Sequence, residues 1–285
     1  MLGRARTLAL PLVVLSLLSW LPARPHAQPK PLEIGVVPHL SAGVLMSNYQ
    51  PLRKYLEREL RRPVQISTAP DFKTFFQRTQ GGEYDMAVTA AHLARVAQLD
   101  AKYAPILVFH PPITGIIITA KDGPMSSSQD LRSKSLAVPN PNSLVVMRGL
   151  QWLAERDLHR DRDFQLMRTP TQDSVADLVI NGDSIAAMLS DGELRAIPEG
   201  LRARLRVLVA FAEIPNFVVL INPGMASLDA AALKASLLRF AEPSEEGKAF
   251  FGAIGIQGMR PVGEADLRAL DPFLDQTRRM MGSSQ

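Results

Sequence analysis

Polar side chains recur at the points where predicted strands end and the following helices begin. The turns read PHLS at 38–41, TAAH at 89–92, NPNS at 140–143 and SD at 190–191. Each turn places a hydroxyl, an amide or an imidazole beside the first N–H groups of a helix, which have no partner within the helix. Those groups and the positive end of the helix dipole bind anions without a charged side chain. These residues therefore predict non-covalent capture of a small molecule with an anionic end.

The candidate ligand-binding residues are the members of these turns. They are His39, Ser41, Thr89, Ala90, His92, Asn140, Asn142, Ser143, Ser190 and Asp191. A purely structural explanation stays open for most of them, because Asn, Ser, Thr and Asp are the residue types that cap helices. His92 has the alternative of packing inside its helix. Asp191 has two explanations of equal weight, a cap or an acceptor for a hydroxyl or amine of the ligand.

The elements that position these turns alternate along the chain. Apolar, β-rich runs alternate with stretches of helical spacing, which predicts parallel βαβ units and an α/β fold. The predicted strands are 32–38, 63–68, 84–88, 105–110, 113–120, 135–139, 164–169, 184–190, 206–211 and 216–222. The predicted helices include 48–60, a helix capped by Asp71, 90–99, one that begins near Ser143, 172–180 and 191–197. Residues 228–280 are predicted to be helices broken at 242–243 and 255–263.

Two segments of the sequence share the same order of elements, which indicates two lobes. FFQRTQGGEYDMAVTAAHL and DLVINGDSIAAMLSDGEL share the order helix, glycine, apolar strand and helix, with Ser190 in the place of Thr89. Chance similarity of ordinary α/β units is the alternative. We predict lobe I from 28–117 plus 213–285 and lobe II from 118–212, each a mainly parallel sheet flanked by helices. Two crossover segments would then form a hinge beside a cleft.

The N-terminus predicts export. A basic start at Arg4 and Arg6, an apolar run from Leu8 to Leu21 and a polar, small-residue tail have the layout of a secretory signal peptide, which we place at residues 1–27. An uncleaved anchor is the alternative, although the apolar run is short of the roughly 20 residues of a membrane span. The predicted location is the periplasm.

Composition excludes several functions. The formal net charge of +4 arises mostly from three arginines in residues 1–27, so the mature chain is close to neutral and nucleic acid is not an expected partner. There is no cysteine, and the five histidines are scattered, so neither a zinc site nor any other cofactor is expected. No nucleophile elbow is present, and we predict no enzymatic activity. We expect a monomer.

The chain resembles the phosphate/phosphite/phosphonate family of periplasmic substrate-binding proteins, which have the two-lobed type II fold. The resemblance rests on IGVVPHLS, NYQPLRKYLERELRRPVQISTAPDF, GGEYDMAVTAAHLARVA, LRSKSLAVPNPNS and INGDSIAAMLSDGEL. It implies that the loop before the helix of lobe II holds the oxyanion with serine and threonine hydroxyls. The matching positions here are Asn142, Ser143, Leu144 and Val145, which retain one hydroxyl.

The resemblance implies a solute-binding protein. Such a protein captures a small, anionic ligand, a phosphonate-like oxyanion or an organic acid, between its lobes and presents it to an ABC permease of the inner membrane. The alternative is a periplasmic sensor or an accessory protein, with a membrane kinase or a periplasmic dehydrogenase as its partner.

Overall fold

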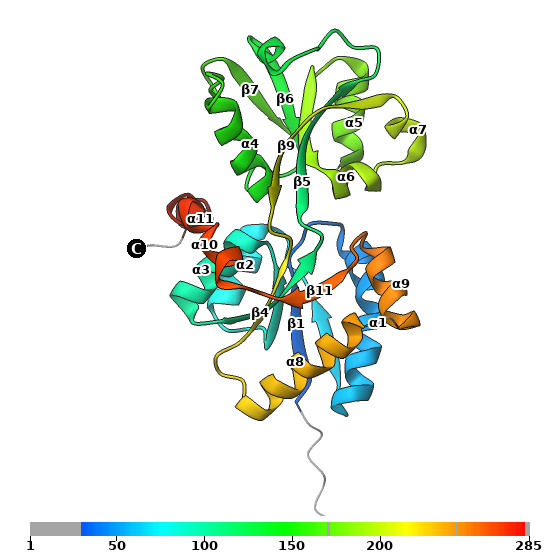
Figure 1. Ribbon diagram of the computed structural model, residues 1–285, viewed down its shortest axis with the longest axis vertical. Helices are drawn as coiled ribbons and strands as arrows, with labels where there is room; N and C mark the ends of the chain where they lie inside the picture. Colours follow the sequence, from blue (N-terminus) through cyan, green and yellow to red (C-terminus); the bar gives the residue numbers. More distant parts are fainter. Residues whose placement is uncertain (1–29, 170–171, 243, 283–285) are drawn as a thin grey trace, which may run out of the picture.

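The structure is a computed structural model that describes residues 30–169, 172–242 and 244–282. Two lobes, each built around its own sheet, lie one above the other and are joined at a waist (Figure 1). The predicted signal peptide, residues 1–27, lies outside the described residues.

The sheet of lobe I contains strands from both ends of the described chain, in the order β11-β4-β10-β3-β1-β2. Strands β1, β2 and β3 are parallel, whereas β10 is antiparallel to both β3 and β4, and β11 is antiparallel to β4. The bounds are β1 Leu32–Val36, β2 Val64–Ser67, β3 Met86–Thr89, β4 Ala104–His110, β10 Val218–Ile221 and β11 Gly258–Pro261.

Helices cover both faces of this sheet. Helices α1, α8 and α9 pack on one face, and α2, α3 and α11 pack on the other (Figure 1). The bounds are α1 Ala42–Leu60, α2 Phe72–Gln80, α3 Ala91–Ala101, α8 Ser227–Ala241, α9 Glu245–Ala253, α10 Glu264–Arg268, the 3₁₀ turn η2 Asp271–Phe273 and α11 Leu274–Met281.

Three predictions for lobe I differ from the structure. The sheet is mixed rather than mainly parallel, because β10 and β11 return from the C-terminal segment and pair antiparallel to β3 and β4. Helix α1 begins at Ala42 rather than at residue 48, because Leu45 and Tyr49 extend the buried stripe of Leu52 and Leu56 by two turns. This places Pro51 inside the helix. The predicted break at 255–263 contains strand β11, whose short sequence GMRP has no recognisable strand pattern.

Lobe II is continuous in sequence. Its sheet has the order β7-β6-β8-β5-β9, with β6, β7 and β8 parallel and β5 antiparallel to both β8 and β9. This sheet too is mixed rather than mainly parallel as predicted. Helix α4 covers one face and α5 to α7 cover the other. The bounds are β5 Ile113–Ala120, η1 Ser128–Leu131, β6 Lys134–Val138, α4 Leu144–Ala154, β7 Phe164–Arg168, α5 Gln172–Asn181, β8 Ala186–Ser190, α6 Asp191–Ala196, α7 Glu199–Arg202 and β9 Leu205–Ile214.

The chain crosses between the sheets at residues 111–112 and 215–217, between β4 and β5 and between β9 and β10. All of β5 pairs with β9, from Ile113 opposite Ile214 to Ala120 opposite Leu205. Residues 113–117 and 213–214, which we predicted in lobe I, therefore pair in the sheet of lobe II. Prolines occupy both crossings and have no N–H to donate to a sheet, so the pairing stops there.

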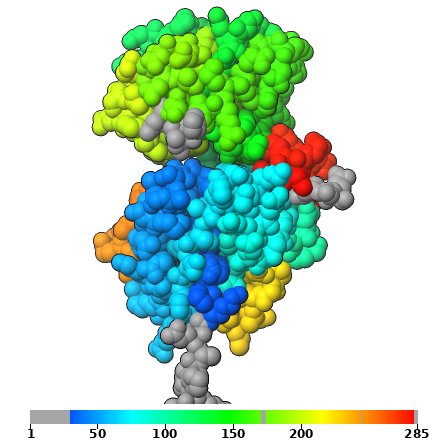
Figure 2. Space-filling view, turned by 180° about the vertical axis from the view of Figure 1, so that it is seen from behind, coloured from blue at the N-terminus to red at the C-terminus, as the bar shows by residue number. Residues whose placement is uncertain are grey.

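The register places the important strand ends at the waist. Thr89, the last residue of β3, pairs with Val218, which directly follows a crossing. Ser190, the last residue of β8, pairs with Gly115, two residues into β5. The carboxyl ends of the parallel strands of both lobes therefore face each other. Figure 2 shows the groove between the lobes at this level.

Candidate ligand-binding site

The start of α3 offers unused hydrogen-bond donors. Its N-cap is Ala90, which has no side-chain oxygen, and its hydrogen bonds begin with the N–H of Ala94, which donates to the Ala90 carbonyl at 2.9 Å. Thr89, one residue earlier, is 2% exposed, and its Oγ1 has no hydrogen-bond partner in the described part of the chain. A buried hydroxyl without a partner is costly, so this group is available to a ligand.

His92 links the two lobes. Its Nε2 lies 3.3 Å from the carbonyl oxygen of Asn142 in lobe II. Burial lowers the pKa of His92 from 6.5 to about 4, although the Asn142 carbonyl acts in the opposite direction. The ring is therefore neutral at pH 7. Because a carbonyl only accepts, Nε2 carries the proton, and Nδ1 is an acceptor that is buried without a partner among the described residues.

The start of α4, which faces it in lobe II, is capped by its own side chains. The Ser143 hydroxyl accepts from the N–H of Val146 at 3.3 Å, and the Asn140 side chain accepts from the N–H of Asn142 at 3.0 Å. Leu144 and Val145 are buried and belong to the same apolar cluster as Leu93 and Ala94 of α3.

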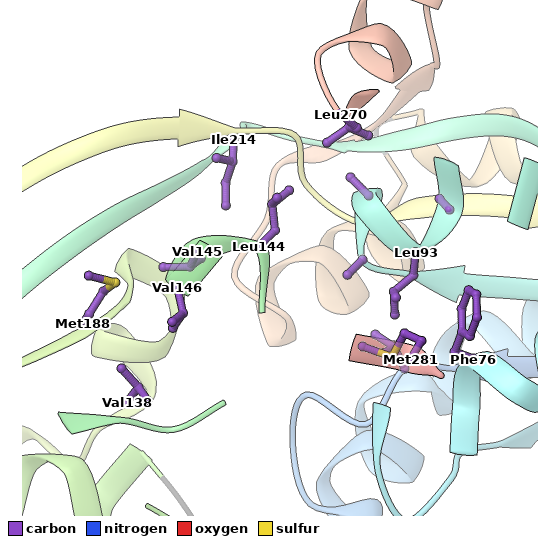
Figure 3. Packing of buried hydrophobic residues seen from close by; sticks show 14 of the residues in the cluster. Phe76, Leu93, Val138, Leu144, Val145, Val146, Met188, Ile214, Leu270 and Met281 are labelled. Atoms are coloured by element: carbon purple, nitrogen blue, oxygen red, sulfur yellow. The ribbon is translucent and has the colours of Figure 1, made fainter. Parts of the chain in front are cut away.

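Figure 3 shows how this cluster joins the lobes. Leu144, Val145 and Ile214 lie on the side of lobe II, and Leu93 lies on the side of lobe I. The position at which the resemblance implied an oxyanion loop therefore contributes mostly apolar contact between the lobes.

The start of α6 is also capped by its own side chains. Ser190 and Glu193 form a capping box, in which the Ser190 hydroxyl accepts from the N–H of Glu193 at 3.0 Å and donates to its carboxylate at 2.8 Å. Burial raises the pKa of Glu193. Glu193 was not among the predicted residues, although the spacing S-x-x-E is a sequence signal for this motif.

Asp191 is held by two partners. One carboxylate oxygen accepts from the N–H of Thr114 at 3.1 Å, and the other pairs with Arg195 at 2.6 Å. Asp191 thus fastens α6 to the start of β5, beside the first crossing. This role accounts for both of its oxygens within lobe II.

The turn after β1 forms another edge of the groove. His39 Nδ1 donates to the Val37 carbonyl at 3.0 Å, and burial lowers the pKa of His39 to about 4. Its ring contacts Phe217 of the second crossing edge-on, with the ring centroids 4.6 Å apart. Ser41 is the exposed N-cap of α1 but makes no capping hydrogen bond, so α1 starts with free donors at the groove.

None of the candidate residues carries a positive charge at pH 7, since both imidazoles are neutral. An anion here would be bound by hydroxyls, N–H groups and helix dipoles. No group of three potential metal ligands occurs in the described residues. Within the same residues, no helix combines the length and the apolar character that crossing a bilayer requires.

A cavity of about 210 Å³ lies against the crossings. It contains none of the candidate residues. Its lining is Val108, Phe109, His110, Pro112, Glu213, Ile214, Pro215, Asn216, Arg260 and Asp266.

Two α/β lobes that meet at their strand ends, joined by two short crossings, define a two-lobed binding protein of the type II periplasmic class. The family of ABC transporter phosphonate periplasmic substrate-binding proteins matches residues 34–267. The chain belongs to this family.

Solved structures share the fold. One is a binding protein component of an ABC phosphonate transporter from Pseudomonas aeruginosa, with a TM-score of 0.75, 16% identity and 90% of each chain covered. Another is PhnD1 from Prochlorococcus marinus in complex with methylphosphonate, with a TM-score of 0.74, 13% identity, and coverage of 90% of this chain and 100% of that one. A third is the aliphatic sulphonate binding protein SsuA from Escherichia coli, with a TM-score of 0.66, 16% identity, and coverage of 90% of this chain and 95% of that one.

These findings confirm the predicted family and the type II fold. They also confirm a solute-binding role for an ABC importer in place of an enzymatic one. The family is periplasmic and works with a small-molecule ligand and an ABC permease.

Proposed function

We propose that this protein captures a small oxyanion, a phosphonate-like compound or an organic acid, in the groove between its lobes. It does so in the periplasm as a monomer, after removal of a signal peptide at residues 1–27, and delivers the ligand to an inner-membrane permease. The candidate residues act as ligand contacts in two groups. Thr89, Ala90, His92 and Ser41 supply polar contacts from lobe I, and the turn before α4, with Asn140, Asn142 and Ser143, completes the site from lobe II.

The observation that supports this proposal most directly is the start of α3. Thr89 Oγ1 is buried without a partner, and the adjacent helix start has no side-chain cap. Both features lie at the face that meets lobe II, where His92 reaches the Asn142 carbonyl. An oxyanion would accept from the Thr89 hydroxyl and from the first N–H groups of α3, and would lie at the positive end of the helix dipole.

A ligand that contacts both lobes would couple its binding to the closure of the lobes. A ligand shifts an equilibrium between open and closed forms only by its difference in affinity for the two. An oxyanion held by α3 and touched by the α4 turn gains its second set of contacts only when the lobes are together. The closed form would then be the one that the permease receives.

The test is a thermal-shift and calorimetric screen of the purified mature chain against methylphosphonate, methanesulfonate, inorganic phosphate, acetate and a set of uncharged amides. We expect at least one oxyanion to raise the melting temperature with its concentration, as binding to the native state requires. The amides should have no effect. A response to the amides alone would contradict the oxyanion site.

A further inference from the structure

The interface between the lobes contains a buried acceptor as well as buried donors. His92 is 1% exposed, and its Nε2 is used by the Asn142 carbonyl, which leaves the Nδ1 lone pair unpaired among the described residues. An oxyanion offers only acceptors, so it can satisfy Thr89 and the α3 N–H groups but not His92 Nδ1. A ligand that matches the whole site must also carry a hydrogen-bond donor.

The surroundings of His92 indicate what kind of donor fits. Its neighbours Ala91 and Leu93 are buried, and Leu144 and Val145 close the same apolar cluster from lobe II. Among the described residues, His92 has no ion-pair partner and no carboxylate shifts its pKa, which burial lowers and the Asn142 carbonyl raises. An ammonium group would lose its hydration there with only one neutral acceptor in return, whereas a hydroxyl needs only that acceptor.

We propose that the ligand is an oxyanion that also carries a neutral hydroxyl group, and that His92 is the residue that selects it by accepting a hydrogen bond from that hydroxyl at Nδ1. This inference rests on the proposed oxyanion site at the start of α3. An analogue of the same ligand without a donor leaves Nδ1 unpaired. An analogue with an ammonium group buries a charge without a counter-ion.

The experiment uses two sets of matched probes and isothermal titration calorimetry with the purified mature chain at neutral pH. One set is 2-hydroxyethylphosphonate, propylphosphonate and 2-aminoethylphosphonate. The other is 3-hydroxypropionate, butyrate and β-alanine. Within the set that binds, we expect the hydroxyl member to bind about tenfold tighter or more than either other member, since leaving a buried group unpaired costs that much.

Two variants separate selection from binding. His92→Phe removes the acceptor and should bring the hydroxyl and alkyl members to within about twofold of each other. Thr89→Val, which removes a donor to the oxyanion, should weaken all members of a set alike and keep their ratio. Circular dichroism confirms that each variant is folded, and the ratios in the unaltered chain test the inference without any variant.

The outcomes are distinguishable. Equal affinities for hydroxyl and alkyl members, or tightest binding by the ammonium member, would overturn the selection by His92 and leave the oxyanion site standing. No binding by any of the six probes would overturn both. A hydroxyl preference that persists in folded His92→Phe would also reject His92 as the selecting residue.

Discussion

The starts of α3 in lobe I and α6 in lobe II have similar local sequences, but the α6 start is capped by a side chain and the α3 start is not. Each helix follows a glycine at positive φ, Gly82 or Gly182, and a short buried strand. Ser190, the cap of α6, and Ala90, the cap of α3, both lie eight residues after their glycine. The hydroxyl of lobe I belongs to Thr89, one residue earlier, and therefore does not reach the cap position.

This shift of one residue decides which helix start is free. Ser190 caps α6 and holds the carboxylate of Glu193, whereas the α3 start has no cap and Thr89 has no partner among the described residues. The lobe II start stabilises the fold, and the lobe I start keeps its donors for something else. Polar residues at matching positions of two similar lobes thus have different functions.

The largest expected difference is in the response to pH. The pKa of His92 falls from 6.5 to about 4 on folding, so the unfolded chain binds a proton that the native chain does not bind over that window. The free energy of unfolding should therefore fall as the pH drops from 6.5 towards 4, by on the order of 3 kcal/mol for this residue. Urea denaturation across that range measures it.

Comparison with His92→Phe isolates this contribution, because His39 acts in the same direction in both proteins. Glu193 acts in the opposite direction: its pKa is raised, so its contribution to stability is present at low pH and is lost as the pH rises through its folded value. An acid slope that is identical in His92→Phe and the parent would contradict the neutral, buried state of His92.

The next largest effect is that of Ser190→Ala. The change removes the α6 cap and leaves the Glu193 carboxylate without the hydroxyl that donates to it, so we expect a loss of about 2 kcal/mol in the free energy of unfolding. Chemical denaturation measures the loss. A loss comparable to the experimental error would show that the box is not what stabilises α6.

Thr89→Val should produce the reverse pattern. It removes a buried hydroxyl without a partner, so stability should not fall, while oxyanion affinity should fall about tenfold, which is about 1.4 kcal/mol. Thr119→Val is the matched control, because the Thr119 hydroxyl donates to the Ile185 carbonyl at 2.9 Å and its loss should lower stability. Equal destabilisation by both variants would contradict the idea that Thr89 is free.

The smallest effect is expected for Ala90→Ser, which gives α3 the cap that α6 has. A serine at an N-cap in place of alanine stabilises a helix by about 1 kcal/mol, so the melting temperature should rise. The new hydroxyl would also compete for the N–H groups proposed for the ligand and should weaken binding a few-fold. Tighter binding by this variant would argue against those N–H groups as ligand contacts.

Much of the fold could be predicted because the ends of the strands are marked in the sequence. The apolar runs that became β1, β3, β6 and β8 each end within about two residues of the predicted point, at a proline or a hydroxyl residue. The crossings were less visible: ITGIIITA is one uniform apolar run, and hydropathy does not show which sheet it joins. That depends on its partner β9, almost a hundred residues later.

The site could be predicted only as a set of turns. Which hydroxyl caps a helix depends on where a strand ends to within one residue, and the sequences TAAH and SDGE give no such precision without coordinates. The contact between His92 and the Asn142 carbonyl depends on how the two lobes meet, which no local pattern encodes.

Strand β10 has a consequence for how the chain matures. It lies between β3 and β4, so the first 110 residues cannot complete their sheet until a segment beyond residue 217 has been delivered. Lobe II, built from 113–214 without interruption, can assemble first. A chain cut short before Val218 would lack both β10 and β11, which leaves β3 with one open edge and β4 with two. Unpaired strand edges promote aggregation, so such a chain should aggregate rather than form a smaller working protein.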